Sequence, residues 1–192
     1  MVIYLTLLSV FLAWEFPLTP RRVSLINIFA IGLPAFIIAL KNVNTSKLKN
    51  FTVELFSFVL ISAAVIVGAA YAGANAIQNM EGITHHGIQM AMLSVMIILT
   101  AANFLAVALY KGEKNMRLYI IYAIGLVGLY LFLGKTQIDF VVIDILKKFY
   151  EISYLEPAFW TPVFTSSIIG AVLLTVLQII RKKIIFEKMK SR

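Results

Sequence analysis

Residues Pro20–Leu40 read PRRVSLINIFAIGLPAFIIAL, an apolar stretch long enough to cross a membrane, with polar and helix-breaking residues near its centre. A transmembrane α-helix needs about 20 predominantly apolar residues. The amide of Asn27 has no water to bond in hydrocarbon, and Pro34 leaves a backbone carbonyl of the preceding turn without its donor. We therefore predict a span that is polar and partly unwound around Gly32 and Pro34, where cation-handling helices place oxygen ligands.

The composition supports a membrane protein over a soluble one. The chain has 192 residues, of which 61% are hydrophobic and 14% charged, whereas soluble domains average about 45–50% apolar and about 25% charged residues. The net charge of +8 comes from residues at the ends of apolar blocks, which is typical of topology signals and argues against nucleic acid as a partner. There is no cysteine, which excludes disulfides, thiolate metal sites and a cysteine nucleophile.

The apolar blocks predict an all-α integral membrane protein with one transmembrane domain over residues 1–192, a bundle of five full transmembrane helices plus one partial N-terminal helix. The apolar run at residues 1–14 is too short to span a bilayer and resembles the outer half of a helix. The full spans are expected at residues 20–40, 51–77, 87–110, 118–134 and 161–180.

Two further patterns concern packing and the membrane surface. Small residues are frequent in the span at 51–77, which favours close helix contacts over a substrate path. Residues 139–156 place apolar side chains at near-helical spacing among charged ones, which predicts an amphipathic helix on the outer membrane surface.

The distribution of lysine and arginine predicts the orientation. When the connections are assigned alternately to the two sides, 12 of the 17 basic residues fall on the side of the C-terminal tail. By the positive-inside rule we expect a multi-pass protein of the plasma membrane with a cytoplasmic C-terminus. Arg21 and Arg22 lie on the opposite side, where we expect their long side chains to reach the outer lipid headgroups.

The run from Pro17 to Phe36 resembles a known family. Pro17–Pro20 (PLTP), Leu25–Asn27 (LIN) and Ile31–Phe36 (IGLPAF) are similar to the end of the fifth helix and the sixth helix of bacterial P-type cation-transporting ATPases. The resemblance implies the C-terminal membrane region of such a pump, from the end of the fifth helix through the tenth. It also agrees with the orientation derived from the basic residues.

The sequence departs from the family in ways that limit what the resemblance implies. Ile31 and Ala30 stand where calcium pumps have an ion-binding Asp and a Thr, so only Asn27 corresponds to a candidate ligand. The Asp-Lys-Thr-Gly-Thr phosphorylation motif is absent, so ATP hydrolysis is not expected of this chain alone. For the parent pump, the resemblance implies Mg²⁺ and ATP, with Ca²⁺ a candidate cargo. The implied partners are membrane lipid, the remaining transmembrane helices and the cytosolic catalytic domains.

Few residues are candidates for cation chemistry. The Asn27 oxygen could ligate a hard cation or form an interhelical hydrogen bond, and the residues alone leave both interpretations open. Asn103 is a weaker candidate, for which helix–helix bonding is the simpler interpretation. Glu54 lies one turn inside the expected cytoplasmic end of its span, where it can reach water. The pair His85-His86 is expected in a solvated outer loop, because adjacent side chains point in different directions and rarely share one metal ion.

The alternative function is a stand-alone small polytopic membrane protein with a scaffolding or regulatory role. A small secondary carrier would also fit the composition, but it predicts an internal repeat, and the sequence shows none.

Overall fold

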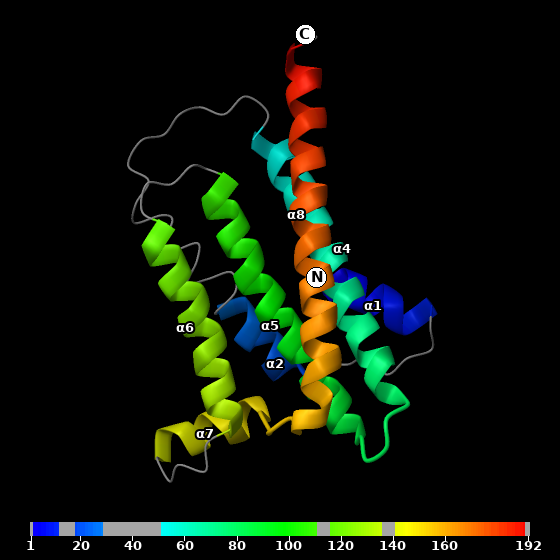
Figure 1. Cartoon of the computed structure of the whole chain (residues 1–192), viewed down its shortest axis with the longest axis vertical. Helices are drawn as coiled ribbons and strands as arrows, with labels where there is room; N and C mark the ends of the chain where they lie inside the picture. Colours follow the sequence, from blue (N-terminus) through cyan, green and yellow to red (C-terminus); the bar gives the residue numbers. More distant parts are fainter. Residues whose placement is uncertain (1, 12–17, 29–50, 111–115, 136–140, 191–192) are drawn as a thin grey trace.

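The computed structural model describes residues 2–11, 18–28, 51–110, 116–135 and 141–190, and this part of the chain forms helices and no strands. Figure 1 shows the long helices arranged as a bundle. The prediction of an all-α membrane protein is confirmed. Within the described residues, three helical segments are long and apolar enough to cross a membrane, and a fourth apolar segment, Tyr119–Leu133, is shorter. The three are Phe56–Gln78, His85–Ala106 and Pro157–Arg181.

Four helices coincide with predicted spans: α4 (Phe51–Gln78), α5 (His85–Tyr110), α6 (Met116–Lys135) and α8 (Trp160–Lys190). The α8 helix continues well past the expected end of its apolar span at residue 180. Two short helices precede these four, α1 (Val2–Phe11) and α2 (Pro20–Ile26).

The α2 helix begins where its sequence favours a start. Thr19 stands at the N-cap in an extended conformation, and Pro20 follows as the first helical residue. Proline suits this position because its fixed φ matches a helix and its missing N–H would have no partner there. The rest of the predicted span 20–40, after residue 28, lies outside the described residues.

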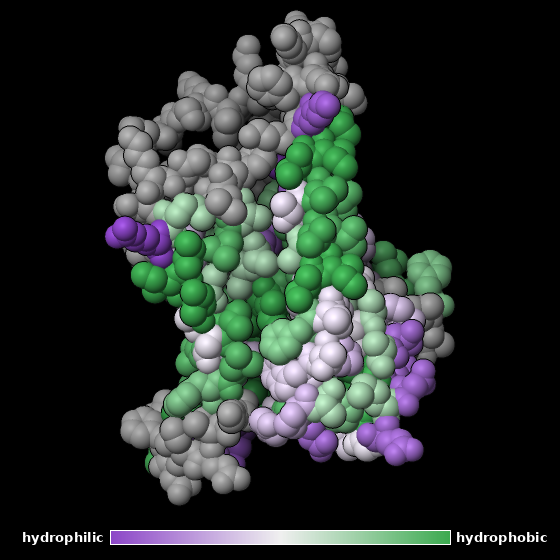
Figure 2. Space-filling view, in the orientation of Figure 1, coloured by the Kyte–Doolittle hydropathy of each residue, from purple (hydrophilic) through white to green (hydrophobic). Residues whose placement is uncertain are grey.

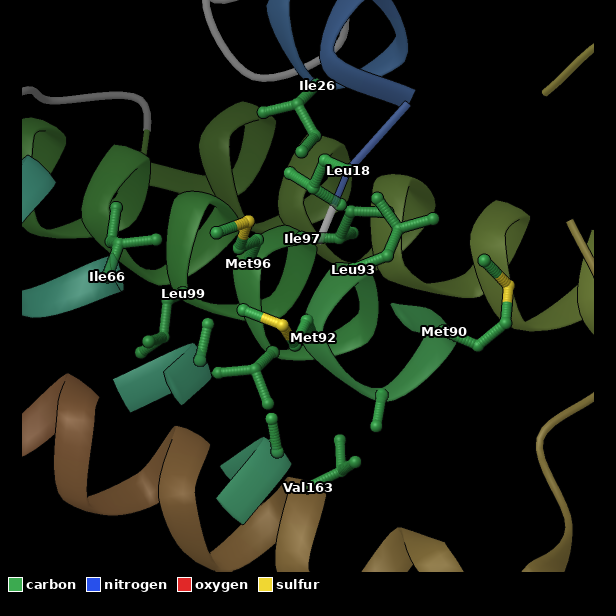
Figure 3. Packing of buried hydrophobic residues seen from close by; sticks show 14 of the residues in the cluster. Leu18, Ile26, Ile66, Met90, Met92, Leu93, Met96, Ile97, Leu99 and Val163 are labelled. Atoms are coloured by element: carbon green, nitrogen blue, oxygen red, sulfur yellow. The ribbon is translucent and has the colours of Figure 1, made fainter. Parts of the chain in front are cut away.

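The α5 helix is the centre of the bundle, in contact with α4, α8 and α6. Inside the molecule, 61% of its apolar segment is buried, against 33% for the segments in α4 and α8. Figure 3 shows its side chains Met92, Leu93 and Leu99 among Ile66 of α4 and Val163 of α8. Methionine is flexible enough to fill irregular gaps, which suits a helix surrounded by several neighbours.

Two glycines allow α8 to approach its neighbours closely. A Cβ atom added to Gly170 would lie 2.8 Å from Leu99 Cδ1 and 2.9 Å from Ala69 Cβ, and one added to Gly73 would lie 2.7 Å from Ser166 Oγ. The small residues expected at helix contacts in the span 51–77 thus include two, Ala69 and Gly73, that lie at the α4–α8 contact. Membrane helices gain stability from such close backbone approach.

The outward faces of α4, α6 and α8 are apolar and exposed, as lipid contact requires. Figure 2 shows a continuous hydrophobic surface along much of α8. Lipid tails are as apolar as these side chains, so no hydrophobic force drives the side chains into the protein interior, and their exposure is expected in a bilayer. Among the described side chains of α8, the most exposed large apolar residues are Ile168, Ile169, Val172 and Ile179.

The amphipathic helix predicted within 139–156 is present as α7 (Val141–Tyr150). It crosses the end of α6 (Figure 1). Ile143 packs against the core, whereas Val141, Ile145 and Phe149 are exposed at four-residue intervals. On another face, Asp144 accepts a hydrogen bond from Lys148 at 2.8 Å, which raises the pKa of this lysine. A short 3₁₀ turn, η2 (Pro157–Phe159), then leads into α8.

Candidate functional site

Asn27 lies at the C-terminal end of α2, with its side chain exposed. Its backbone N–H donates to the carbonyls of both Ser24 and Val23. Asn27 and Ile28 then adopt a π-helical conformation. Local π-helical turns occur frequently at functional sites. Asn27 itself nevertheless keeps α-helical dihedral angles, φ −63° and ψ −42°, and Gly32 and Pro34 lie outside the described residues.

Asn103 takes part in a polar network between three helices, called here the Ser62 network (Ser62, Asn103 and Gln178). The Ser62 hydroxyl on α4 donates to Asn103 Oδ1 on α5 at 3.1 Å. The Gln178 amide on α8 donates to Ser62 Oγ at 2.8 Å and to the Phe58 carbonyl at 3.3 Å. Ser62 and Gln178 are buried, and Asn103 is half-buried. Since each helix supplies one side chain, the network fixes how α4, α5 and α8 are turned toward one another.

The groups around the Ser62 network favour a role in hydrogen bonding between helices over a role in cation binding. Gln178 Oε1 is buried and has no hydrogen-bond partner among the described residues, so one acceptor remains. However, Arg181 is also buried one turn further along α8, where it donates to Ser57 Oγ at 3.2 Å and lies 5.3 Å from the Phe58 ring centroid. A guanidinium this close to the network opposes the entry of a second cation.

The described residues do not bring the remaining candidates together into a cation site. Glu54 falls in the first turn of α4, and its side chain lies outside the described residues. Within the part of the chain that the structure describes, no group of three or more histidine, aspartate or glutamate side chains is placed to hold a metal ion. Ser94 and Thr100, which form a polar stripe with Asn103 in the sequence, make other contacts. Ser94 Oγ lies 2.8 Å from Tyr130 Oη, and Thr100 donates to the Met96 carbonyl.

A second polar group surrounds Arg22 and is called here the Arg22 cluster (Arg22, His86, Gln89 and Glu151). Arg22 Nη1 donates to Gln89 Oε1 at 2.6 Å, and Nη2 donates to His86 Nδ1 at 3.1 Å. Nη2 also donates to the Glu151 carbonyl at 3.1 Å and lies 3.5 Å from the Glu151 carboxylate. The Arg22 side chain has an exposed fraction of 0%. One guanidinium thus joins α2 to α5 and to the end of α7.

Glu151 holds an unusual backbone conformation within this cluster. Its φ is +53°, a value that residues other than glycine rarely adopt. The next N–H, that of Ile152, donates to the Lys147 carbonyl at 3.0 Å, which closes the end of α7 in the arrangement that usually has glycine at the Glu151 position. Strained conformations persist where the surroundings fix them, and here Arg22 binds both the carbonyl and the carboxylate of Glu151.

The Arg22 cluster was not predicted from the sequence. Both Arg21 and Arg22 were expected at the lipid headgroups, but the structure separates them. The Arg21 side chain is 55% exposed, 3.8 Å from the Glu151 carboxylate and 5.4 Å from the Phe149 ring centroid, whereas Arg22 is buried. The sequence did contain a signal of a polar site on α5, because His86 and Gln89 are three residues apart and therefore share one helix face.

The histidine pair also lies differently from the expectation. His85 and His86 open α5 instead of forming a loop. The Thr84 hydroxyl accepts a hydrogen bond from the Gly87 N–H at 3.1 Å, which caps this helix so that it begins two residues before the predicted start at residue 87.

In comparisons with known proteins, no family model, curated protein or solved structure matches the chain.

Proposed function

We propose that this chain is the C-terminal membrane part of a bacterial P-type ATPase that actively transports a cation. The observation that carries the proposal is the motif from Pro17 to Phe36, together with the geometry at Asn27. The motif resembles the outer loop and sixth helix of these pumps. The π-helical turn that begins at Asn27 also supports the proposal, because such turns are frequent at functional sites.

In this proposal the chain supports transport and does not hydrolyse ATP. The Ser62 network and the close contacts of Gly73 and Gly170 make α4, α5 and α8 a rigid unit against which α2 can be positioned. Asn27 would contribute one neutral oxygen to the cation path. Because Ca²⁺ takes six to eight oxygen ligands, the remaining ligands would come from helices outside this sequence. Mg²⁺ and ATP would act in the cytosolic domains of the parent pump, and Ca²⁺ is one candidate cargo.

The DNA flanking this reading frame tests the assignment directly. A frame that encodes Asp-Lys-Thr-Gly-Thr, fused to this one or adjacent to it, would supply the missing catalytic half. A promoter and ribosome-binding site with no such partner would overturn the proposal in favour of a stand-alone scaffolding or regulatory membrane protein.

In the assembled pump, Asn27→Ala should raise the cation concentration for half-maximal phosphorylation by about tenfold, the effect of losing about 1.4 kcal/mol of binding free energy. The measurement is phosphoenzyme formation against cation concentration. Ser24→Ala is the matched control, since the Ser24 hydroxyl only donates to the Arg21 carbonyl at 2.8 Å on the same helix. Equal cation affinity in Asn27→Ala and the parent would reduce Asn27 to a packing residue.

The proposal also includes an orientation, with the plasma membrane as the location and the C-terminus in the cytoplasm. A phosphatase reporter fused after Lys190 should be inactive, and a cytoplasmic reporter such as β-galactosidase should be active there, because the tail carries the largest group of basic residues. Fusions after Glu81, between α4 and α5, should give the opposite pattern. An active phosphatase after Lys190 would reverse the orientation.

A further inference from the structure

We propose that the Arg22 cluster is a proton-sensitive contact that fixes α2 against α5 and the end of α7 and releases it when His86 becomes protonated. This is a property of the chain itself, and it does not rest on the transport function proposed above. It concerns the helix that carries Asn27, five residues after Arg22.

The protonation state of His86 follows from the chemistry of its partner. An arginine guanidinium has only donors, so the nitrogen it contacts must accept. His86 Nδ1 lies 3.1 Å from Arg22 Nη2, which requires a neutral imidazole with its proton on Nε2. A proton on Nδ1 removes the acceptor and places a second positive charge beside a buried guanidinium. The contact therefore exists above the pKa of His86 and is lost as the pH falls below it.

The other groups around His86 set the balance of charge. Arg22 from α2 is positively charged and lies 3.1 Å from the ring, His85 is the adjacent titratable residue on the same helix, and the Glu151 carboxylate after α7 is the negative charge of the cluster. Glu151 divides its charge between Arg22 at 3.5 Å and the more exposed Arg21 at 3.8 Å. Arg22 cannot move into water while α2 stays in place, because its side chain is fully buried. The His86 side chain is exposed and can turn toward water, but the buried guanidinium then lacks an acceptor, which solvent can replace only if α2 shifts.

The contacts of α2 make such a shift feasible. The helix has only seven residues, Pro20–Ile26, and packs mainly against α5 and α7. Leu25 and Ile26 are buried, but the only hydrogen bonds between side chains of α2 and other described elements run through Arg22. Protonation of His86 therefore removes one of these three hydrogen bonds and adds repulsion at the same contact. Few other polar contacts hold α2 in place.

The chain is suited to a direct test because it contains no cysteine and two histidines. Between about pH 8 and about pH 5.5, histidine is the side chain whose ordinary pKa lies within the range. Spin labels on Ser24→Cys in α2 and Glu81→Cys before α5 would report the position of α2 in lipid nanodiscs. We expect a single narrow distance distribution at the higher pH and an about tenfold larger displaced population at the lower pH, in proportion to the loss of a charge-assisted hydrogen bond.

Two matched substitutions identify the titrating group. His86→Gln keeps an acceptor for Arg22 and cannot be protonated, so its distance distribution should be the same at both pH values. His85→Gln should retain the transition of the parent protein. Far-UV circular dichroism at both pH values verifies that each variant is folded, and His86→Asn replaces His86→Gln if the latter is not. A pH-independent distribution in the parent, a transition that persists in His86→Gln, or its loss in His85→Gln would each overturn the proposal.

Discussion

Gly170→Val should destabilise the helix bundle by about 1–3 kcal/mol, the usual cost of adding volume to a packed core. A Cβ atom at this position would lie 2.9 Å from Ala69 Cβ, and an alanine Cβ cannot rotate away because it is bonded to the backbone. The Leu99 methyl group at 2.8 Å can move more easily. The α4 and α8 helices must therefore separate, and the packing of α5 against both is weakened as well.

The measurement is the free energy of unfolding in mixed micelles, followed by circular dichroism during titration with a denaturing detergent. Gly68→Val is the matched control, since a Cβ atom at Gly68 of α4 meets nothing within 4 Å. Both variants exchange glycine for the same β-branched residue within a long helix, so the intrinsic helix preference cancels between them. An equal loss of stability in the two variants would show that close packing at Gly170 is unimportant.

The helices of this fold could be predicted from the sequence because lipid imposes a simple rule. Each spanning segment must satisfy its own backbone hydrogen bonds and present apolar side chains over a fixed length. The runs 51–77 and 87–110 meet that rule and coincide with α4 and α5. The rule applies less well at helix ends, where Thr84 extends α5 by a capping hydrogen bond and α8 continues to Lys190 through charged residues.

Side-chain partners were harder to predict, because they depend on how helices are turned about their axes. Asn103 is recognisable as a polar residue in an apolar span, but its partners Ser62 and Gln178 come from distant helices. Gln178 lies near the end of the expected span 161–180, where a polar residue is common and gives no signal of a buried partner. Arg22 was placed at the headgroups because length and charge alone favour that location. Only the fold brings His86, Gln89 and Glu151 around it.

Arg22→Met should cost about 3 kcal/mol of unfolding free energy, more than any exposed charge in the chain. Methionine fills much of the arginine volume, so the loss comes mainly from polar groups left without a donor. Gln89 Oε1, His86 Nδ1 and the Glu151 carbonyl all lose the hydrogen bonds that Arg22 supplies. The loss should fall at the lower end of the range for a broken buried ion pair, because the Glu151 side chain is 40% exposed and water can solvate its carboxylate.

Arg21→Met removes the same charge from the adjacent residue and is the control. The Arg21 side chain is 55% exposed and only 3.8 Å from the Glu151 carboxylate, an exposed pair of the kind that contributes about 0–1 kcal/mol. Both variants change the net charge equally, so the difference between their unfolding free energies reports burial and hydrogen bonding at Arg22. If the two variants lose the same stability, the guanidinium of Arg22 is solvated in the native protein, and the Arg22 cluster does not hold α2 in place.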